Sequence, residues 1–583
     1  MIKTLGAQIK EFKKASILTP VFMILEVFME TVIPLLMASI IDDGVNAGNI
    51  RHIYVTGGYM VLAAAGGLIA GVLGGRYGAQ ASAGFARNLR DAMFTNIQSF
   101  SFANIDKFST AGLVTRMTTD VTNMQNSYQM ILRMCTRAPA SLICAMVMAF
   151  TINVKLASIY LGAVILLGVC LFFIMNSASR YYQQAFPKYD DMNASVQENV
   201  SAIRVVKAYV REEEETVKFK RASRHIYDLF MKAENRLMVT PPLMQFTVYG
   251  CILLISWIGA KMIVGTTLTT GELMSLLAYC MNILMSLMML SMVFVMISMS
   301  LASARRIAEV LNEKSSLVNP DTPDYVVPDG SIEFRNVDFS YREGSEEAVL
   351  KNISLSITSG ETIGIIGGTG SAKTSLVNLI SRLYDVTSGQ VLVGGKDVRT
   401  YDVETLRNEV AVVLQKNVLF AGTILDNLRW GDKNADEEMC RRACILACAD
   451  EFIQKMPKKY ETYIEQGGTN VSGGQKQRLC IARALLKKPR VLILDDSTSA
   501  VDTATDARIR RAFAEEIPDT TKLIIAQRIA SVEKADRIIV MDDGKISGYG
   551  THEELLRSNE IYREVYESQT GGGGDFDESA GEL

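Results

Sequence analysis

Residue types that bind phosphate groups occur together in one glycine-rich segment. Its sequence is Gly367-Gly368-Thr369-Gly370-Ser371-Ala372-Lys373-Thr374. The apolar stretch Glu361–Ile366 before it is expected to form a strand, and Ser375–Leu383 after it a helix. In such an arrangement the loop N–H groups surround phosphate oxygens at the positive end of the helix. The segment from Gly367 to Ser375 is therefore the expected phosphate site, with Lys373 on the outer phosphates and Thr374 at Mg²⁺.

Two further stretches carry chemistry of the same kind. Asp495 and Asp496 follow the apolar strand expected at Arg490–Leu494, and a carboxylate in that position can hold Mg²⁺. Ser472-Gly473-Gly474-Gln475 precedes a helical pattern and forms a second potential anion-binding helix start. Two phosphate-binding helix ends in one domain suggest a nucleotide shared between two copies of that domain.

Composition divides the chain into two halves, and the phosphate-binding residues named above all lie in the second half. The 583 residues are 49% hydrophobic with a formal net charge of −3, which excludes a disordered chain and argues against a nucleic-acid partner. Residues 1–320 carry a net charge of +8 and 26 of the 29 methionines. Residues 321–583 carry a net charge of −11, and their composition resembles that of a soluble domain. We therefore expect a membrane domain at 1–318, a turn-rich linker at 319–330, an α/β domain at 331–569 and a disordered tail at 570–583.

The first half contains six apolar runs of about the 20 residues that cross a bilayer. They are Ala15–Ile41, Ile53–Gly75, Leu132–Ile152, Leu156–Met175, Leu243–Ala260 and Leu273–Ala304. The segment Arg180–Arg236 carries eleven Lys and Arg, whereas the loops after runs 1, 3 and 5 carry Arg51, Lys155 and Lys261. Basic residues favour the cytoplasmic side. We expect a multi-pass protein of the cell membrane, with both termini and the second half in the cytoplasm.

Two features of the runs concern a transported molecule. Glu26 and Glu30 share one helix face, and acids at that depth are costly and commonly functional. They could recognise a cationic substrate, or they could serve helix packing, which we favour. The last run holds Met274, Met281, Met285, Met288, Met289, Met292, Met296 and Met299. Flexible methionines suit varied apolar ligands, although lipid contact or packing is the simpler explanation.

The ordered motifs together resemble those of an ATP-binding cassette, and six spans followed by a cassette resemble an ABC exporter half-transporter. The resemblance covers the whole chain and implies ATP and Mg²⁺ as ligands. It implies that Tyr341 stacks on adenine and that Gln415 senses Mg²⁺. It matches Val471–Gln475 to the family signature, and Ser499, Ala500, Val501 and Asp502 to a loop that crosses the dimer interface. Helix tips near Asp106–Thr110 and Arg211–Glu215 would pass motion to the spans.

Besides Val471, which stands where the signature usually has leucine, three positions depart from the family pattern. Ala372 replaces a glycine before Lys373, and its methyl group would be tolerated if φ stays negative. Asp496 stands where the family has a glutamate base, and its carboxylate reaches less far. Gln527 stands where the family has a switch histidine, and none of His52, His225 and His552 falls there. An amide can donate a hydrogen bond but cannot carry the charge of an imidazole.

These departures predict a weak hydrolytic site beside an intact signature. We expect a second half-transporter with the missing glutamate and histidine as partner, in an exporter of lipophilic or amphipathic small molecules, lipids or peptides. The alternatives are a homodimeric exporter with low ATPase activity and a regulatory or channel-like membrane protein that uses ATP binding as a switch. Import on the same scaffold also remains open.

Overall fold

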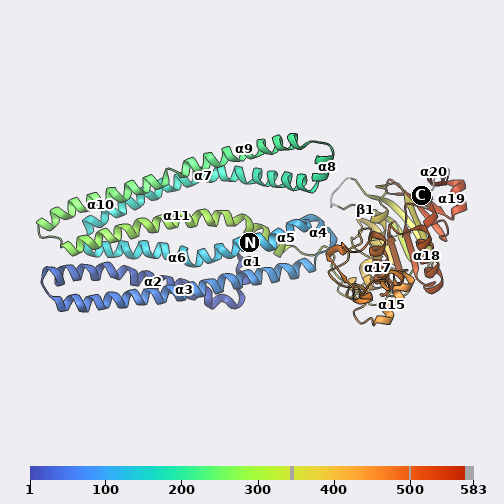
Figure 1. The fold of residues 1–583 in the computed structure, drawn as a ribbon, viewed down its shortest axis with the longest axis horizontal. Helices are drawn as coiled ribbons and strands as arrows, with labels where there is room; N and C mark the ends of the chain where they lie inside the picture. The colour runs from blue at the N-terminus through green and yellow to red at the C-terminus, as the bar shows by residue number, and fades with distance from the viewer. Residues whose placement is uncertain (342–346, 498–499, 571–583) are drawn as a thin grey trace. The chain divides into compact units, whose positions relative to one another are not determined.

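The computed structural model describes residues 1–341, 347–497 and 500–570, and the chain forms two compact units. Unit 1 comprises Met1–Gln98 and Ser109–Glu313, and unit 2 comprises Ser99–Phe108 and Lys314–Leu583. Ser499 and the tail expected beyond residue 570 lie outside the described residues. Figure 1 shows the helices of unit 1 in blue to green and the strands of unit 2 in yellow to red.

Unit 1 is helical throughout its described residues. Its long helices are α2 (Lys13–Ser39), α3 (Ile50–Gln98), α6 (Val121–Ile152), α7 (Val154–Ser201), α9 (Glu212–Leu237), α10 (Thr240–Val264) and α11 (Thr270–Asn312). Short turns join them: α1 (Ile2–Gly6), η1 (Ala7–Phe12), η2 (Ile40–Asn46), α5 (Thr110–Thr115), η3 (Arg116–Asp120) and α8 (Ile203–Ala208). Six helical stretches are long and apolar enough to cross a membrane, which confirms the predicted helical membrane domain.

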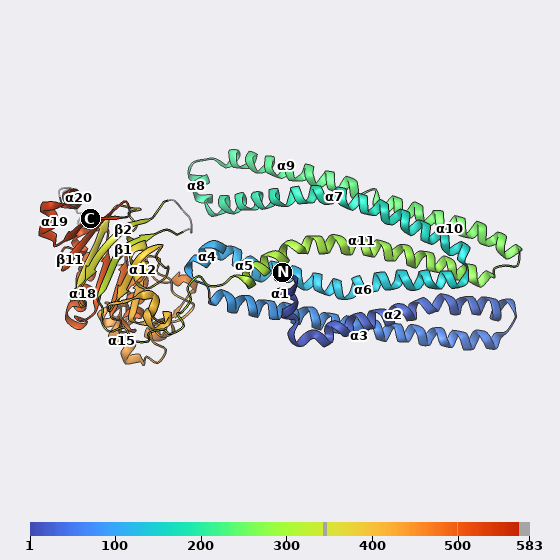
Figure 2. The same cartoon turned by 180° about the vertical axis from the view of Figure 1, so that it is seen from behind.

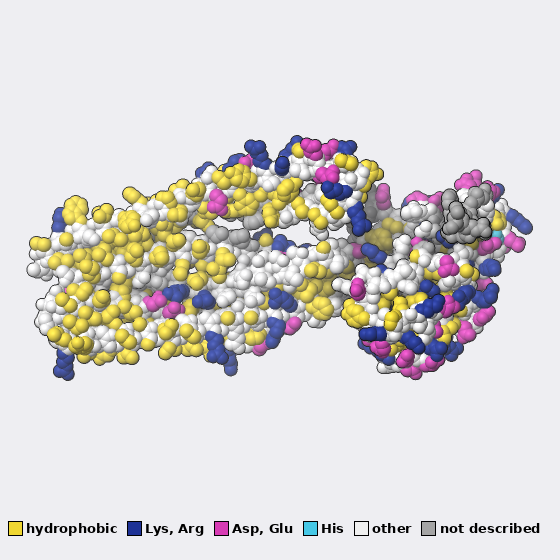
Figure 3. Space-filling model, viewed as in Figure 1, with side chains coloured by type: hydrophobic (Ala, Val, Ile, Leu, Met, Phe, Trp, Pro, Cys, Tyr) yellow, Lys and Arg dark blue, Asp and Glu magenta, His cyan; other side chains and the backbone are white. Residues whose placement is uncertain are grey.

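Small residues bring α2 and α3 close together. A Cβ atom on Gly74 would lie 2.3 Å from Cε of Met23, so a larger residue there would require the Met23 side chain to move. The helix α6 packs against the same pair, and α11 packs against α6. Figures 1 and 2 show α9 and α10 running back along α7 as a long hairpin. Hydrophobic side chains cover the visible face over α2, α3 and α10, as expected for a lipid-facing surface (Figure 3).

Unit 2 contains two main sheets. One is antiparallel with the order β2-β1-β4-β5, and the other has the order β12-β11-β3-β10-β9-β6, parallel except at the β12 edge. The strands are β1 (Ile332–Phe339), β2 (Leu350–Ile357), β3 (Thr362–Gly367), β4 (Ser388–Val393), β5 (Lys396–Asp397), β6 (Val410–Val413), β9 (Val491–Asp495), β10 (Thr521–Ile525), β11 (Arg537–Asp542) and β12 (Lys545–Gly550), with β7 (Gly422–Thr423) and β8 (Tyr463–Ile464) as a separate small pair. This sheet confirms the predicted α/β domain.

Helices cover the parallel sheet on both faces. They are α12 (Lys373–Ile380), α13 (Val403–Glu409), α14 (Ile424–Leu428), α15 (Glu437–Leu446), α16 (Asp450–Ile453), α17 (Gly473–Leu485), α18 (Thr503–Glu516), α19 (His552–Ser558) and α20 (Glu560–Thr570). The short helix α4 (Phe102–Phe108), from the first half of the chain, also belongs to unit 2. Every residue of β9 and β10 is buried, so their carboxyl ends are held rigidly. Ile525 pairs with Asp495 on one side and Ile365 on the other, which places the loops after β3, β9 and β10 together.

Candidate functional site

The glycine-rich loop leads from β3 into α12, as the sequence predicts. Nζ of Lys373 donates to the carbonyl oxygens of Gly367 (2.8 Å) and Gly368 (2.7 Å), so the lysine lies across the loop. Burial lowers its pKa, while Asp495 and Asp496 oppose that shift. The three groups that hold this ammonium group are neutral loop oxygens, which a phosphate oxygen could replace as acceptors.

Ala372 has a left-handed backbone, with φ = +71° and ψ = +24°, at the residue that precedes α12. The tolerance expected for its methyl group required a negative φ, and that condition is not met. An L-residue with a side chain in this conformation is strained by about 1–2 kcal/mol relative to its right-handed form. The loop therefore keeps the shape that a glycine would give it and carries strain at Ala372.

Thr374 and Asp495 form the expected metal-binding pair. The Thr374 hydroxyl donates to both carboxylate oxygens of Asp495, at 2.9 and 3.2 Å. Asp495 is 2% exposed, and burial raises its pKa although the Thr374 hydrogen bond opposes the shift. A hard divalent cation prefers two adjacent oxygen donors of this kind, so the pair fits Mg²⁺. The exposed Gln415 side chain, by contrast, makes no hydrogen bond with any described residue.

Asp496 and Gln527 meet directly. Nε2 of Gln527 donates to Oδ2 of Asp496 at 2.8 Å, because the loops after β9 and β10 are neighbours. Asp496 also has a positive φ of +47°. The two departures from the family pattern thus form one hydrogen-bonded pair beside the phosphate loop.

A side chain from the last described helix holds the backbone on both sides of Arg528. Gln569 in α20 donates from Nε2 to the carbonyl of Gln527 (2.9 Å) and accepts from the N–H of Ile529 (2.8 Å). The sequence analysis did not identify Gln569, because no local motif marks a contact between residues 40 positions apart. This amide fixes the backbone that carries Gln527.

The signature segment forms a helix start held by its own side chains. The Ser472 hydroxyl accepts from the N–H of Gln475, and the Gln475 side chain accepts from the N–H of Ser472 at 2.9 Å. A Cβ atom on Gly474 would lie 2.7 Å from the carbonyl oxygen of Ala500, so this glycine allows a close approach. Asp502 caps α18 by accepting from the N–H of Thr505. Gly473 opens α17, and the N–H groups of a first helical turn are the donors that an anion site uses.

Tyr341, the predicted adenine-stacking residue, stands next to α12. Its hydroxyl shares a 2.8 Å hydrogen bond with the Ser375 hydroxyl, and its ring meets Tyr384 edge-on at 5.1 Å. The ring is 44% exposed. An aromatic ring with this exposure, bonded to the helix that follows the glycine-rich loop, is suitable for stacking on a planar ligand.

The first predicted helix tip contacts the α/β domain within unit 2. Oη of Tyr384 donates to Oδ2 of Asp106 in α4 at 2.7 Å, and the ring of Phe102 lies 6.1 Å from that of Tyr384. Burial and the hydrogen bond to Asp106 raise the pKa of Tyr384. Tyr384 lies outside every motif, so sequence reasoning did not find it.

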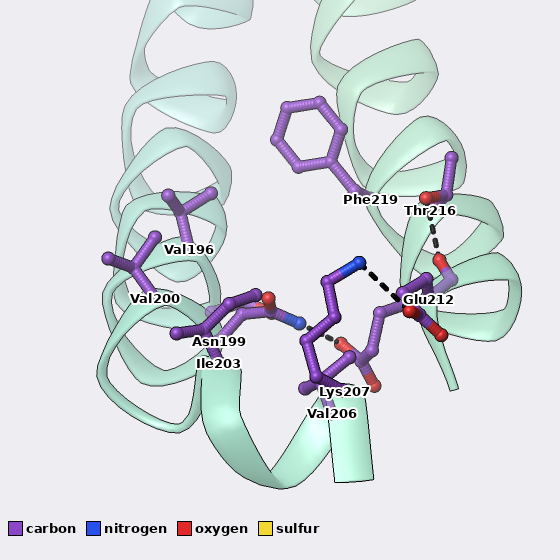
Figure 4. A pocket seen from close by; sticks show the side chains of 11 residues that line it. Val196, Asn199, Val200, Ile203, Val206, Lys207, Glu212, Thr216 and Phe219 are labelled. Atoms are coloured by element: carbon purple, nitrogen blue, oxygen red, sulfur yellow. Dashed lines mark hydrogen bonds and ion pairs between the residues drawn. The ribbon is translucent and has the colours of Figure 1, made fainter. Parts of the chain in front are cut away.

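The second predicted tip is the turn from α7 through α8 into α9. It encloses a cavity of about 340 Å³ lined by apolar side chains such as Val196, Val200 and Phe219 (Figure 4). Lys207 pairs with Glu212 at 2.9 Å, and Asn199 donates to Glu215 at 2.9 Å across the mouth of the turn. Arg211 also contacts Glu214. The tip is therefore held by polar contacts around an apolar space.

Glu26 and Glu30 in α2 share one cationic partner. Nη1 of Arg137 in α6 lies 2.8 Å from Glu26, and Nη2 lies 2.8 Å from Glu30. Oε2 of Glu26 is buried and has no hydrogen-bond partner in the described part of the chain. The structure thus adds Arg137 to the pair of acids and gives the two carboxylates one shared cationic partner.

Comparisons with known proteins agree with this architecture. Residues 16–288 match the ABC transporter transmembrane region, and residues 350–499 match the ABC transporter domain. An uncharacterized ABC transporter ATP-binding protein of Bacillus subtilis, YfiB, is 36% identical over 554 residues, which cover 94% of this chain and 96% of YfiB. The ATP-dependent lipid A-core flippase of Desulfotalea psychrophila is 32% identical over 465 residues, covering 79% and 80%.

The fold has a solved counterpart. The structure of a bacterial Atm1-family ABC exporter with ATP bound matches with a TM-score of 0.83 at 23% identity, covering 96% of this chain and 99% of that chain. The ordered nucleotide motifs, the six membrane helices and the full-length relatives lead to one conclusion: the chain belongs to the ABC transporter family, as a half-transporter with one membrane region fused to one ATP-binding cassette.

Proposed function

We propose that this half-transporter is the degenerate-site subunit of a heterodimeric exporter. The observation that carries the proposal is the Asp496–Gln527 pair, in which the carboxylate at the position of the base accepts a 2.8 Å hydrogen bond from a neutral amide. The signature, by contrast, is complete in Ser472, Gly473, Gly474 and Gln475. The chain then holds ATP at its own loop and completes a competent site on its partner.

The chemistry of the pair supports slow hydrolysis. A general base must reach its water, and the carboxylate of aspartate is one methylene shorter than that of glutamate. The Asp496 carboxylate also accepts a hydrogen bond from Gln527, whose neutral amide cannot take up charge. Loss of general-base catalysis typically slows a reaction by about 10²–10⁴-fold.

The residues of the site retain what binding requires. Lys373 supplies a positive charge, Thr374 and Asp495 supply oxygen ligands for Mg²⁺, and Tyr341 supplies an aromatic face for adenine. ATP held at this loop acts as a long-lived clamp between the two cassettes. The contact of α4 with Tyr384 carries cassette movement to the spans, so that an inward-facing cavity becomes outward-facing.

The described surface of the spans supports a lipophilic or amphipathic cargo, such as a small molecule, a lipid or a peptide. Seven methionines of α11 are between 36% and 64% exposed: Met274, Met281, Met285, Met288, Met289, Met292 and Met296. Flexible thioethers adapt to varied apolar shapes. Glu26 and Glu30 favour a cargo with positive charge, because Arg137 neutralises only one of them.

Transport by paired subunits tests the proposal. The chain is reconstituted in vesicles with its cassettes outward, alone and together with a half-transporter that carries the glutamate and the histidine. We expect ATP-dependent uptake of a cationic lipophilic dye only with both subunits. Equal uptake by the chain alone would contradict the heterodimer, and movement of dye out of the vesicles would contradict export from the cytoplasm.

A further inference from the structure

A basic cavity of about 480 Å³ lies in the cassette between α18 and the segment that follows β10. Of its twelve lining residues four are basic and none is acidic. The basic residues are Arg510, Arg511, Lys522 and Lys534, and Phe513 and Ile524 provide an apolar wall. None of these residues belongs to the nucleotide site described above. A cavity with this lining suits an anionic ligand that also has an apolar group.

Three of the four cations form no close ion pair within the described part of the chain. Arg510 pairs with Asp506 at 3.0 Å and donates to the carbonyl of Ala530 at 2.8 Å. Arg511, Lys522 and Lys534, however, form no ion pair or side-chain hydrogen bond with any residue that the structure describes.

Of these three, Lys522 gives the strongest support for an anionic ligand, because the residue is only 3% exposed. Burial lowers its pKa, although the nearby Asp536 and Asp519 oppose the shift. An ammonium group at the end of a largely buried side chain loses part of its hydration. A carboxylate placed in the cavity would compensate for that loss.

The chain carries an acidic segment close to this cavity. Gln569 bonds to the N–H of Ile529, and the next residue, Ala530, lines the cavity. Four glycines follow Thr570, and then come Asp575-Phe576-Asp577-Glu578. A link of five residues can span about 17 Å, at about 3.4 Å per residue. A short link between a segment and its binding site raises the effective concentration of that segment to about the millimolar range.

We propose that Asp575–Glu578 binds in this cavity of its own chain. The carboxylates pair with Arg511, Lys522 and Lys534, and the Phe576 ring packs on the wall formed by Phe513 and Ile524. The binding adds contacts to Ala530 and Ser531, which follow Gln527 closely in the chain. The acidic segment thus joins α20 in holding the loop that carries Gln527.

Photo-crosslinking in the full chain tests this assignment. Phe576 is replaced by benzoylphenylalanine, the purified chain is irradiated, and cross-linked peptides are mapped by mass spectrometry. We expect links to peptides within 507–535. The double variant Arg511→Glu with Lys534→Glu should reduce their yield at least about tenfold, because like charges repel the segment. Lys458→Glu, which reverses an exposed charge elsewhere on the cassette, should leave the yield unchanged.

A charge swap separates lost binding from lost folding. Adding Asp577→Arg and Glu578→Lys to the double variant should restore the links. Links to other parts of the cassette would overturn the proposal. A cross-link yield that neither charge reversal changes would also overturn it. Links between two chains would instead assign the cavity to the acidic segment of another copy, and would overturn binding within one chain.

Discussion

At the scale of single residues, Ala372 shows how a glycine motif survives a substitution. The loop keeps a left-handed conformation at this position, so the methyl group is strained rather than accommodated. We expect Ala372→Gly to stabilise the chain by about 0.5–1 kcal/mol, because the gain from released strain exceeds the added flexibility of the unfolded chain. Thermal unfolding of the purified chain, with and without ATP, measures the effect.

Gly370→Ala is the matched control. Gly370 has φ = +87°, and a Cβ atom there would meet nothing within 4 Å, so this change adds strain without a clash. It should lower the unfolding temperature. A lower unfolding temperature for Ala372→Gly would show that the alanine is not strained.

The Asp496–Gln527 pair makes a second prediction at the same scale. Changing Asp496 to Glu and Gln527 to His together should raise phosphate release at least about tenfold, because the pair would regain the reach and the charge of a working base. Each single change should raise phosphate release by a smaller factor than the double change, since the two side chains contact each other. Phosphate release is measured with Lys373→Ala in the same background as the inactive control. An unchanged rate would mean that another feature limits hydrolysis.

Part of the site could be read from the sequence at this scale. The order of motifs predicted the Thr374–Asp495 pair, because strand–loop–helix geometry fixes both residues locally. The φ of Ala372 could not be predicted, since the strain is set by the loop around it. The partners Gln569 and Arg137 could not be predicted either, because they join elements far apart in the chain.

At the scale of elements, the strands and helices could be predicted from the apolar periodicity of the sequence and the length of its apolar runs. The strand expected at Arg490–Leu494 is β9, which is shifted by one residue, and the helix expected from Ser375 begins at Lys373. Helix starts are hard to place when the first turn also binds a ligand loop. The association of α4 with unit 2 depends on Tyr384, which no pattern in the sequence marks.

The contact between α20 and the Gln527 loop can be tested by hydrogen exchange. Gln569→Ala should speed exchange of the Ile529 amide about five- to tenfold, because its hydrogen-bond acceptor is lost. Gln569→Glu is the matched control, since it keeps an acceptor for Ile529 but removes the donor to Gln527. Equal exchange in Gln569→Ala and the unmodified chain would contradict the contact.

The cluster that joins α2 to α6 gives a further prediction. Arg137→Ala should lower the unfolding temperature by several degrees, because it leaves Glu26 and Glu30 without their shared cation. Replacing Arg137, Glu26 and Glu30 all by glutamine should lower the unfolding temperature less than Arg137→Ala does, since no charge is then left unpaired. Thermal unfolding in detergent compares the variants. A triple variant less stable than Arg137→Ala would contradict this account.

At the scale of the whole molecule, the division of charge and methionine between the two halves corresponds to two units with different chemistry. The helical unit presents apolar side chains, and the cassette presents the phosphate loop and the signature. Under the function proposed above, the Asp496–Gln527 pair and the intact signature make fast turnover depend on a second chain. The choice between a homodimer and a heterodimer is therefore the central question about this molecule.

ATP turnover by the purified chain in lipid nanodiscs answers that question most directly. The measurement compares the chain alone with the chain assembled with a half-transporter that has the glutamate and the histidine. The account predicts tight ATP binding by the chain alone, with hydrolysis at least about 10²-fold slower than in the assembled pair. Hydrolysis by the chain alone at the rate of the pair would contradict it.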